Sequence, residues 1–259
     1  MSCAALRAGK HVVVEKPMAM SLREADRMIA AARKAAKVLT VHQSRRYSPD
    51  IMYIRQVIES GILGEVFFIR MGGYSFQRRA DWQMLRKFGG GQLNNWGSHV
   101  VDQALTLLKH PVNKVYADLR HTVGAGDAED HLKIVLQADR GPTIDIELTG
   151  ACAVPLPQWV LMGTCGTLVS QGGTSRIRYL NPKGLRKPRV SEVLTHRRYG
   201  TDEQLPWQEK EEPTRTEQSV DFYGNLYAAI RHRSKLLVTP ESVRELIRVL
   251  DLRRKTSGF

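Results

Sequence analysis

The stretch Ala8-Gly-Lys-His-Val-Val-Val-Glu-Lys-Pro17 decides how the first part of this 259-residue chain folds. A short apolar run, residues 11–14, ends in Glu15, Lys16 and Pro17. This pattern is typical of a buried parallel strand that delivers polar residues to the carboxyl edge of a sheet, where doubly wound α/β folds bind their ligands. Parallel strands need crossover connections of about a dozen residues, and only seven residues precede Ala8. We therefore expect the chain to begin in the middle of a domain.

The residues that follow complete one strand–helix–strand unit. Ser21 and Glu24 have the spacing of a capping box at a helix start, and residues 38–41 form a second apolar run. We interpret residues 1–43 as the remaining part of a doubly wound domain and residues 44–259 as a second domain.

The predicted secondary structure changes along the second domain. Residues 49–60 and 95–108 have helical patterns, and residues 112–180 hold short β segments separated by turn residues. Residues 181–217 are rich in charge and proline, which predicts an irregular excursion, and two helices, 218–232 and 239–255, close the chain. Strand runs flanked by helices predict an α+β domain with one open, mostly antiparallel sheet.

Three motifs carry a resemblance to a known family: Glu15-Lys16-Pro17, Arg46-Tyr47-Ser48-Pro49, and Gly89-Gly-Gly-Gln-Leu-Asn-Asn-Trp-Gly-Ser-His-Val-Val-Asp102. In this order they resemble the glucose–fructose oxidoreductase / inositol dehydrogenase (Gfo/Idh/MocA) family over nearly the whole chain. The resemblance implies that residues 1–43 are a remnant of a dinucleotide-binding Rossmann domain, followed by the substrate and oligomerisation domain. The G-x-G-x-x-G turn of that family occurs nowhere in these residues, so we expect a truncated chain.

The resemblance implies an NAD or NADP cofactor and a catalytic set formed by Lys16, Asn95 and His99. Lys16 would stabilise a developing alkoxide beside the nicotinamide; the alternative is a surface lysine after a buried strand. Asn95 is expected to cap a helix, which puts His99 in its first turn, where the helix dipole disfavours the imidazolium. Asp102, one turn on, would then orient the imidazole. The alternative for His99 is a capping or packing role.

Asn95 departs from the family pattern, because many relatives carry an aspartate there. An amide can hydrogen-bond substrate or lysine, but it accepts no proton and supplies no charge. This places more of the proton transfer on His99 and Lys16.

The cofactor and substrate contacts follow from the same resemblance and from the composition of one loop. Glu15, Lys16, Pro17 and Arg46 are the expected cofactor-binding residues, although a lone arginine such as Arg46 also fits a surface or interdomain ion pair. The loop over residues 74–88 is basic and aromatic, so Arg79 and Trp82, together with Asn95 and His99, are expected to bind a sugar-like substrate. An exposed lid or a subunit contact is the alternative for this loop.

Composition limits the remaining classes of function. The net charge of +13 and the pI of 9.9 suggest nucleic acid, but the basic residues are scattered and form no recognisable module. No run approaches the ~20 apolar residues of a membrane span, and the histidines and three cysteines lack metal-ligand spacing. We expect a cytoplasmic protein without metal, nucleic-acid or membrane partners.

Two hypotheses therefore describe the function. The first is an NAD(P)-dependent oxidoreductase that moves hydride between nicotinamide and a carbinol carbon of a sugar, polyol or similar substrate. The second is a non-catalytic module derived from that family, which binds a ligand or forms a homodimer or homotetramer through the open sheet. The glycine-rich turn is the main anchor of the pyrophosphate, and its absence from the sequence is what keeps the second hypothesis open.

Overall fold

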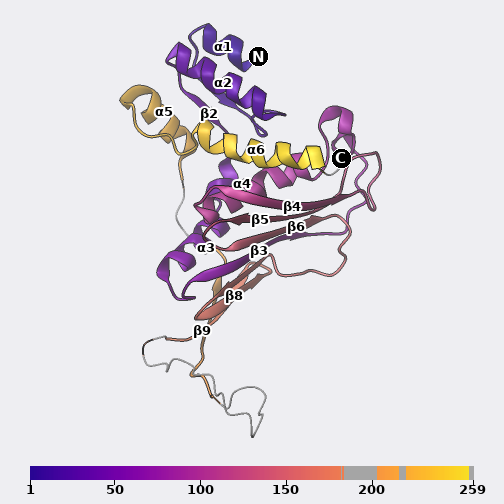
Figure 1. The fold of residues 1–259 in the computed structure, drawn as a ribbon, viewed down its shortest axis with the longest axis vertical. Helices are drawn as coiled ribbons and strands as arrows, with labels where there is room; N and C mark the ends of the chain where they lie inside the picture. The colour runs from indigo at the N-terminus through magenta and orange to yellow at the C-terminus, as the bar shows by residue number, and fades with distance from the viewer. Residues whose placement is uncertain (182, 184–202, 216–219, 257–259) are drawn as a thin grey trace.

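The computed structural model describes residues 1–181, 183, 203–215 and 220–256, with side chains to residue 251. These residues form a small N-terminal unit with a two-stranded sheet and a larger part with an eight-stranded sheet, shown in Figure 1. Most of the excursion predicted for residues 181–217 lies outside the described residues. Within it, β10 (Gln208–Pro213) pairs antiparallel with β9 (Thr174–Tyr179), so the prediction of irregular structure is wrong there.

The N-terminal unit contains the predicted strand–helix–strand element. Its elements are α1 (Ser2–Arg7), β1 (Val12–Val14), α2 (Leu22–Ala35) and β2 (Leu39–Val41), and β1 pairs parallel with β2. Ser21 caps α2 by accepting a hydrogen bond from the Glu24 backbone N–H, while the Glu24 carboxylate accepts from the Met20 N–H. The carboxyl ends of both strands therefore lie at one edge, as the apolar pattern predicts.

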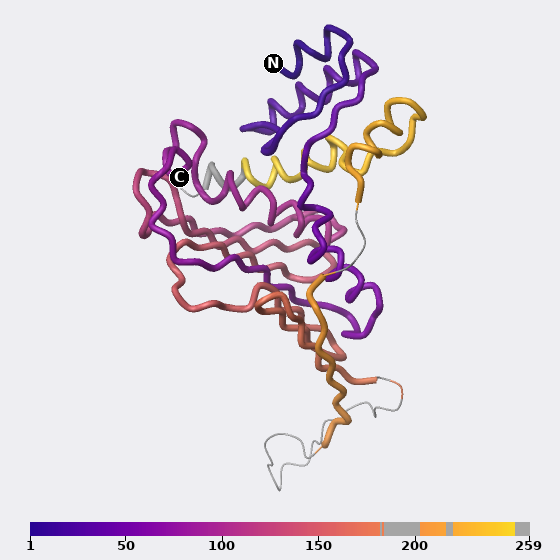
Figure 2. The backbone as a smooth tube through the Cα atoms, turned by 180° about the vertical axis from the view of Figure 1, so that it is seen from behind, coloured from indigo at the N-terminus to yellow at the C-terminus, as the bar shows by residue number. Residues whose placement is uncertain are grey.

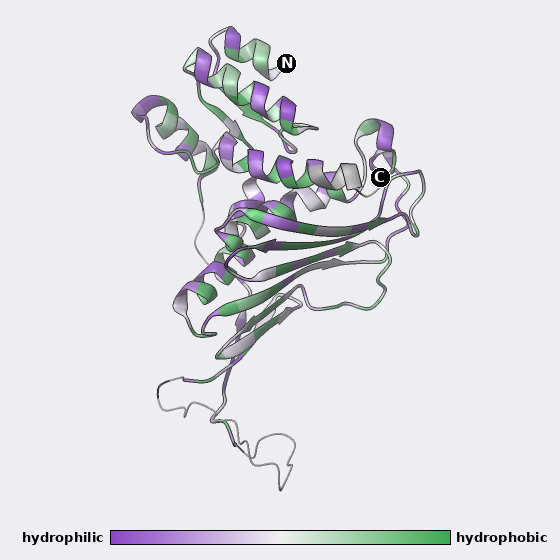
Figure 3. Cartoon of the chain, viewed as in Figure 1, coloured by the Kyte–Doolittle hydropathy of each residue, from purple (hydrophilic) through white to green (hydrophobic). Residues whose placement is uncertain are grey.

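The larger sheet is open and mostly antiparallel, which confirms the predicted architecture. Its order is β10-β9-β8-β7-β3-β6-β5-β4, and β3 with β6 is the one parallel pair among the described strands of this sheet. Figure 3 shows hydrophobic and hydrophilic residues alternating along these strands, so that one face is apolar. The remaining strands are β3 (Val66–Tyr74), β4 (Val112–Arg120), β5 (His131–Ala138), β6 (Thr143–Thr149), β7 (Trp159–Gly163) and β8 (Gly166–Gln171).

The apolar face packs against helices, and its core includes Ile69, Ile134, Ile146 and Leu161. The described helical elements outside the N-terminal unit are η1 (Ser44–Tyr47), α3 (Pro49–Ser60), the short η2 (Trp82–Met84) and η3 (Arg86–Phe88), the π-helical turn η4 (Leu93–Gly97), α4 (Ser98–Leu108), α5 (Phe222–His232) and α6 (Pro240–Thr256). Burying these apolar side chains supplies the main favourable free energy of folding.

Helix α6 connects the two sheets. It packs on α2 and β2 of the N-terminal unit and on α4 and β4 of the larger part, an arrangement visible in Figures 1 and 2. The Thr40 hydroxyl of β2 also donates to the Val238 carbonyl just before α6, at 2.7 Å. This packing brings the carboxyl edge of β1 and β2 against helix η4–α4.

Candidate functional site

Lys16 lies two residues beyond β1, at the carboxyl edge predicted from the sequence. Its Nζ donates to the Asn95 carbonyl oxygen at 2.9 Å and to the Asn95 side-chain Oδ1 at 3.4 Å. Partial burial, and secondarily the charge of Arg45, hold the pKa of Lys16 below its usual value, against an opposing effect of Glu15. An ammonium has three donors, and no described residue takes the third one, which leaves it available to a ligand oxygen.

His99 is oriented by Gln43, which follows β2. The His99 Nδ1 lies 3.2 Å from Gln43 Oε1, and the Gln43 Nε2 donates to the Ser98 carbonyl at 3.4 Å. Because the Ser98 carbonyl can only accept, the amide oxygen of Gln43 must face the ring, so His99 carries its proton on Nδ1. The Nε2 atom then has the free lone pair that a general base needs.

The site holds His99 neutral at physiological pH. Burial, followed by the positive charges of Lys16, Arg45 and His42, lowers the pKa of His99 to about 4. The sequence predicts a neutral imidazole, but on the ground of a helix dipole at its first turn. The structure gives burial and neighbouring cations as the causes.

The helix around Asn95 begins earlier than predicted. The turn η4 starts at Leu93 and runs directly into α4, and the Asn95 backbone N–H donates to the Gly91 carbonyl at 3.1 Å. Asn95 therefore lies inside the helical segment, and its prediction as N-cap is wrong. Its Nδ2 donates to Gln83 Oε1 at 3.0 Å, so its Oδ1 is the atom turned toward Lys16.

Asp102 does not orient His99, and Arg46 does not lie in the site as a cofactor ligand. Arg46 Nε donates to Asp102 Oδ2 at 2.9 Å, Arg46 Nη2 bonds Asp102 Oδ1, and Nη1 donates to the Ser242 hydroxyl at 2.8 Å. The two side chains are 6% and 1% exposed. Arg46 therefore forms an ion pair, but a buried one within the second domain rather than the surface or interdomain pair given as its alternative, and this pair joins η1, α4 and α6.

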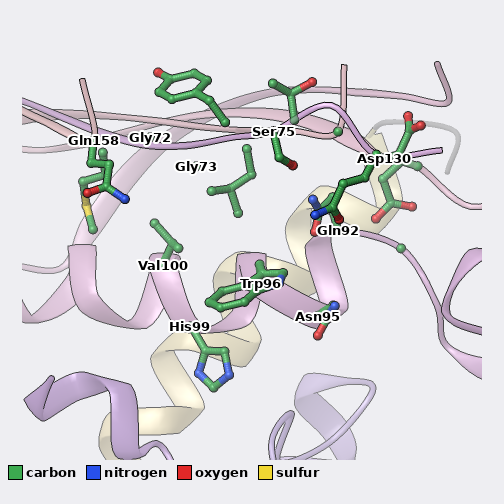
Figure 4. Close-up of a pocket in the computed structure, with 18 of the residues that line it drawn as sticks. Gly72, Gly73, Ser75, Gln92, Asn95, Trp96, His99, Val100, Asp130 and Gln158 are labelled. Atoms are coloured by element: carbon green, nitrogen blue, oxygen red, sulfur yellow. The ribbon is translucent and has the colours of Figure 1, made fainter. Parts of the chain in front are cut away.

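A cavity of about 450 Å³ lies between the sheet and the helical segment η4–α4. Figure 4 shows Val100 pointing toward the sheet and the Trp96 ring lying along the helix, while Asn95 and His99 point away from the sheet. All four residues line the cavity, as do Arg45, Gln92, Gln103 and Glu129. A single sugar or polyol fits in this volume.

The substrate loop is only partly placed as predicted. Arg79 lines the cavity, whereas Trp82 is 57% exposed and is absent from the lining, as are Arg86, Lys87 and Phe88. The aromatic side chains that line the cavity are Tyr74, Trp159 and Trp96, of which Trp96 stands within the third sequence motif. That motif was the available signal for Trp96; nothing local pointed to Gln43 as the partner of His99.

Two of the glycines that precede η4 are required by the backbone conformation. Gly89 and Gly91 have φ values of 72° and 103°, in the region that favours glycine. A Cβ on Gly91 would collide with the Glu129 carboxylate, which accepts a hydrogen bond from the Leu93 backbone N–H at 2.9 Å. These glycines thus shape the start of the helical segment that carries Asn95 and His99.

The residues at the carboxyl edge fit the reactive end of a nicotinamide cofactor. Lys16 offers a free donor there, next to a neutral imidazole, at the end of parallel strands where such cofactors bind. Glu15 is exposed, with Oε1 3.2 Å from His42 Nδ1, and the Lys16–Pro17 bond is cis. Among the described residues no glycine-rich turn is present to hold a pyrophosphate. Searched over the same residues, the structure has no helix long and apolar enough to cross a membrane.

Two family models match the chain. One, described as "Oxidoreductase family, NAD-binding Rossmann fold", matches residues 1–43, and the other, "GFO/IDH/MocA C-terminal domain", matches residues 51–169. The chain is 33% identical over 177 residues to an uncharacterized oxidoreductase of Schizosaccharomyces pombe, covering 65% of this chain and 48% of that protein. It spans about half the length of several curated relatives that it matches.

Two further similarities extend over nearly the whole chain. The scyllo-inositol 2-dehydrogenase (NADP(+)) IolW of Bacillus subtilis is 26% identical over 268 residues, covering 99% of this chain and 72% of that protein. A solved structure of an NAD-binding protein from Listeria innocua superposes with a TM-score of 0.84 at 25% identity, covering 99% of this chain and 75% of that one.

Proposed function

Because the chain belongs to the Gfo/Idh/MocA family of oxidoreductases, we propose that it carries the proton-transfer site of an NAD(P)-dependent dehydrogenase or reductase. The observation that supports this most directly is that Lys16 of the N-terminal unit is hydrogen-bonded to Asn95, which lines the cavity together with His99 of the helical segment η4–α4. Their polar atoms provide an oxygen-stabilising cation beside a neutral base. The proposed substrate is a sugar, polyol or related carbinol, in keeping with the name of the B. subtilis relative.

Each of the three residues has a defined part. His99 takes the proton of the substrate hydroxyl on Nε2 during oxidation and returns it during reduction, since its Nδ1 proton is held by Gln43. Lys16 uses its third N–H to stabilise the negative charge that develops on the same oxygen. Asn95 fixes the Lys16 ammonium through two hydrogen bonds. The nicotinamide, NAD or NADP, exchanges hydride with the carbinol carbon when bound.

The experiment that tests this proposal combines binding and turnover on the 259-residue protein. We expect saturable fluorescence changes with NADH or NADPH, and nicotinamide reduction with a member of a polyol and sugar panel. The His99→Gln variant should lose turnover by at least about a hundred-fold with unchanged cofactor affinity. A folded protein that binds neither cofactor would contradict the enzyme proposal and favour the non-catalytic module.

We also propose that the chain forms a homodimer or homotetramer through the open face of the large sheet. Tyr116, Met162 and Val169 are exposed at 61%, 38% and 36%, and their strand register places them on the face opposite the helices. Light scattering should give a dimer or tetramer mass, and Tyr116→Lys should lower it. A strictly monomeric protein over a wide concentration range would contradict this proposal.

A further inference from the structure

The turn η1, just after the N-terminal unit, is held against α4 by two side-chain contacts. Its residue Arg46 is bound to Asp102 of α4, and Gln103, also of α4, donates from Nε2 to the Arg45 carbonyl at 2.7 Å. The backbone of Arg45 therefore has a fixed position relative to the helix that carries His99. The side chain of Arg45 extends from this fixed backbone position and lines the cavity.

The guanidinium of Arg45 is stacked on the ring of Trp96. Its Cζ lies 4.4 Å from the centroid of the Trp96 ring, and the same ring lies 6.2 Å from the His99 ring in an edge-on arrangement. A guanidinium that lies over a ring presents its planar set of N–H donors at the edges, where a ligand can reach them. Trp96 thus limits the freedom of Arg45 without consuming its donors.

Arg45 has no ionic partner among the described residues, unlike the other arginine of the cavity. Arg79 forms an ion pair with Asp81 at 2.8 Å, whereas the ion pairs of the described residues do not include Arg45. Among the described residues Lys16 likewise forms no ion pair, and its Nζ donates to the neutral Asn95. The positive charges of Lys16 and Arg45 both act on His99 and help to keep its imidazole neutral.

The acidic residues that line the cavity are occupied elsewhere. Glu129 accepts from the Leu93 backbone N–H, and Asp130 accepts from the backbone N–H groups of residues 122–124. Asp50 is bonded to the Ser48 hydroxyl. None of these carboxylates forms an ion pair with Arg45. Its side chain is exposed although it lines the cavity, so its N–H donors can exchange water for the carboxylate of a ligand.

We propose that the site selects a substrate that carries a carboxylate, and that Arg45 binds this carboxylate while Lys16 and His99 act on the carbinol. The substrate class is a sugar acid or polyol acid. The inference rests on the proposed function and adds the charge of the substrate to it. The planar fork of an arginine matches the two oxygens of a carboxylate, and one guanidinium balances its single charge.

The test compares acids with neutral partners in which a hydroxymethyl group replaces the carboxylate. The pairs are D-glucuronate and D-glucose, D-galacturonate and D-galactose, and D-gluconate and D-glucitol. Their affinities for the 259-residue protein are measured by calorimetry and by tryptophan fluorescence, without turnover. We expect the acid of at least one pair to bind about ten-fold tighter than its neutral partner, because its hydrogen bonds to Arg45 are charge-assisted.

The variant Arg45→Gln should remove that preference, weakening the acid about ten-fold and the neutral partner less than two-fold. Arg45→Lys keeps the charge and should retain part of the preference, which guards against a folding defect in the first variant. Arg23→Gln removes the same charge from an exposed position on α2 and serves as the matched control. It should leave both affinities unchanged.

The outcomes separate this inference from the proposed function. Equal affinity within every pair, no binding of any acid, or equal weakening of acid and neutral sugar by Arg45→Gln would overturn the inference. Acids that bind through Arg45, with no turnover by either nicotinamide cofactor, would support it and refute the proposed function. Turnover of neutral polyols with no preference for acids would support the proposed function and refute the inference.

Discussion

The buried ion pair between Arg46 and Asp102 gives the most quantitative prediction for stability. Asp102→Asn keeps the size of the side chain but removes its charge, which leaves the Arg46 guanidinium, 6% exposed, without a counter-charge. Removing one partner of a buried pair costs about 3–5 kcal/mol. That is a large part of the ~5–15 kcal/mol by which a typical domain is stable.

Urea unfolding measures this cost. At a slope of about 3 kcal/mol per molar, the predicted loss lowers the midpoint by about 1 M or more. Asp118→Asn is the matched control, because Asp118 pairs with Arg120 at an exposed position on β4. It should leave the midpoint within error. A change of less than about 1 kcal/mol for Asp102→Asn would refute the structural role that we assign to the pair.

Three other predictions concern the site directly. Gln43→Leu removes the acceptor of the His99 Nδ1 proton, so turnover should fall about ten- to a hundred-fold with little change in KM; an unchanged kcat would disprove the orienting role. Because the pKa of His99 is lowered to about 4, the folded state binds fewer protons than the unfolded state between about pH 4 and pH 6.5. The free energy of unfolding should therefore decrease as pH falls through this window, less steeply in His99→Gln; parallel curves in denaturant titrations would contradict this. Gly91→Ala should destabilise by about 1–3 kcal/mol, because of the φ of 103° and the collision with Glu129; thermal unfolding equal to that of the unaltered protein would count against it.

The sequence was sufficient to predict which secondary-structure elements carry the site residues, but not which side chains those residues contact. The apolar run before Glu15 was enough to place Lys16 at a carboxyl edge, and the third motif was enough to place His99 on a helix facing the same place. Both predictions depend on local patterns: a buried strand that ends in polar residues, and glycines that precede an amphipathic helix. Such patterns survive folding because each element buries its apolar side.

The contacts that were mispredicted are between segments distant in sequence. Asp102 has the helical spacing to reach His99, but Arg46, 56 residues away, captures its carboxylate. Gln43, also 56 residues from His99, takes the orienting role. Spacing within one helix defines which partners are possible, and the packing of η1 and of Gln43, which precedes it, on α4 selects among them.

The edge strand β10 was missed for a different reason. Its sequence, Gln208-Glu-Lys-Glu-Glu-Pro213, has low strand propensity and no apolar alternation. The pairing is supported instead by ionic contacts with the neighbouring strand, such as Arg176 Nη2 to Glu209 at 2.7 Å. Charged residues and proline are frequent on edge strands, where they discourage further pairing, so composition alone does not distinguish such a strand from a loop.

The most direct test of the central claim is the protonation state of His99 in solution. Nitrogen-15 NMR of the imidazole, assigned with His99→Gln, reports the tautomer and the titration midpoint together. The account predicts a neutral ring at pH 7 with its proton on Nδ1, and a midpoint near 4. A midpoint at or above the ordinary value of about 6.5, or a proton on Nε2, would contradict the assignment of His99 as the base of this site.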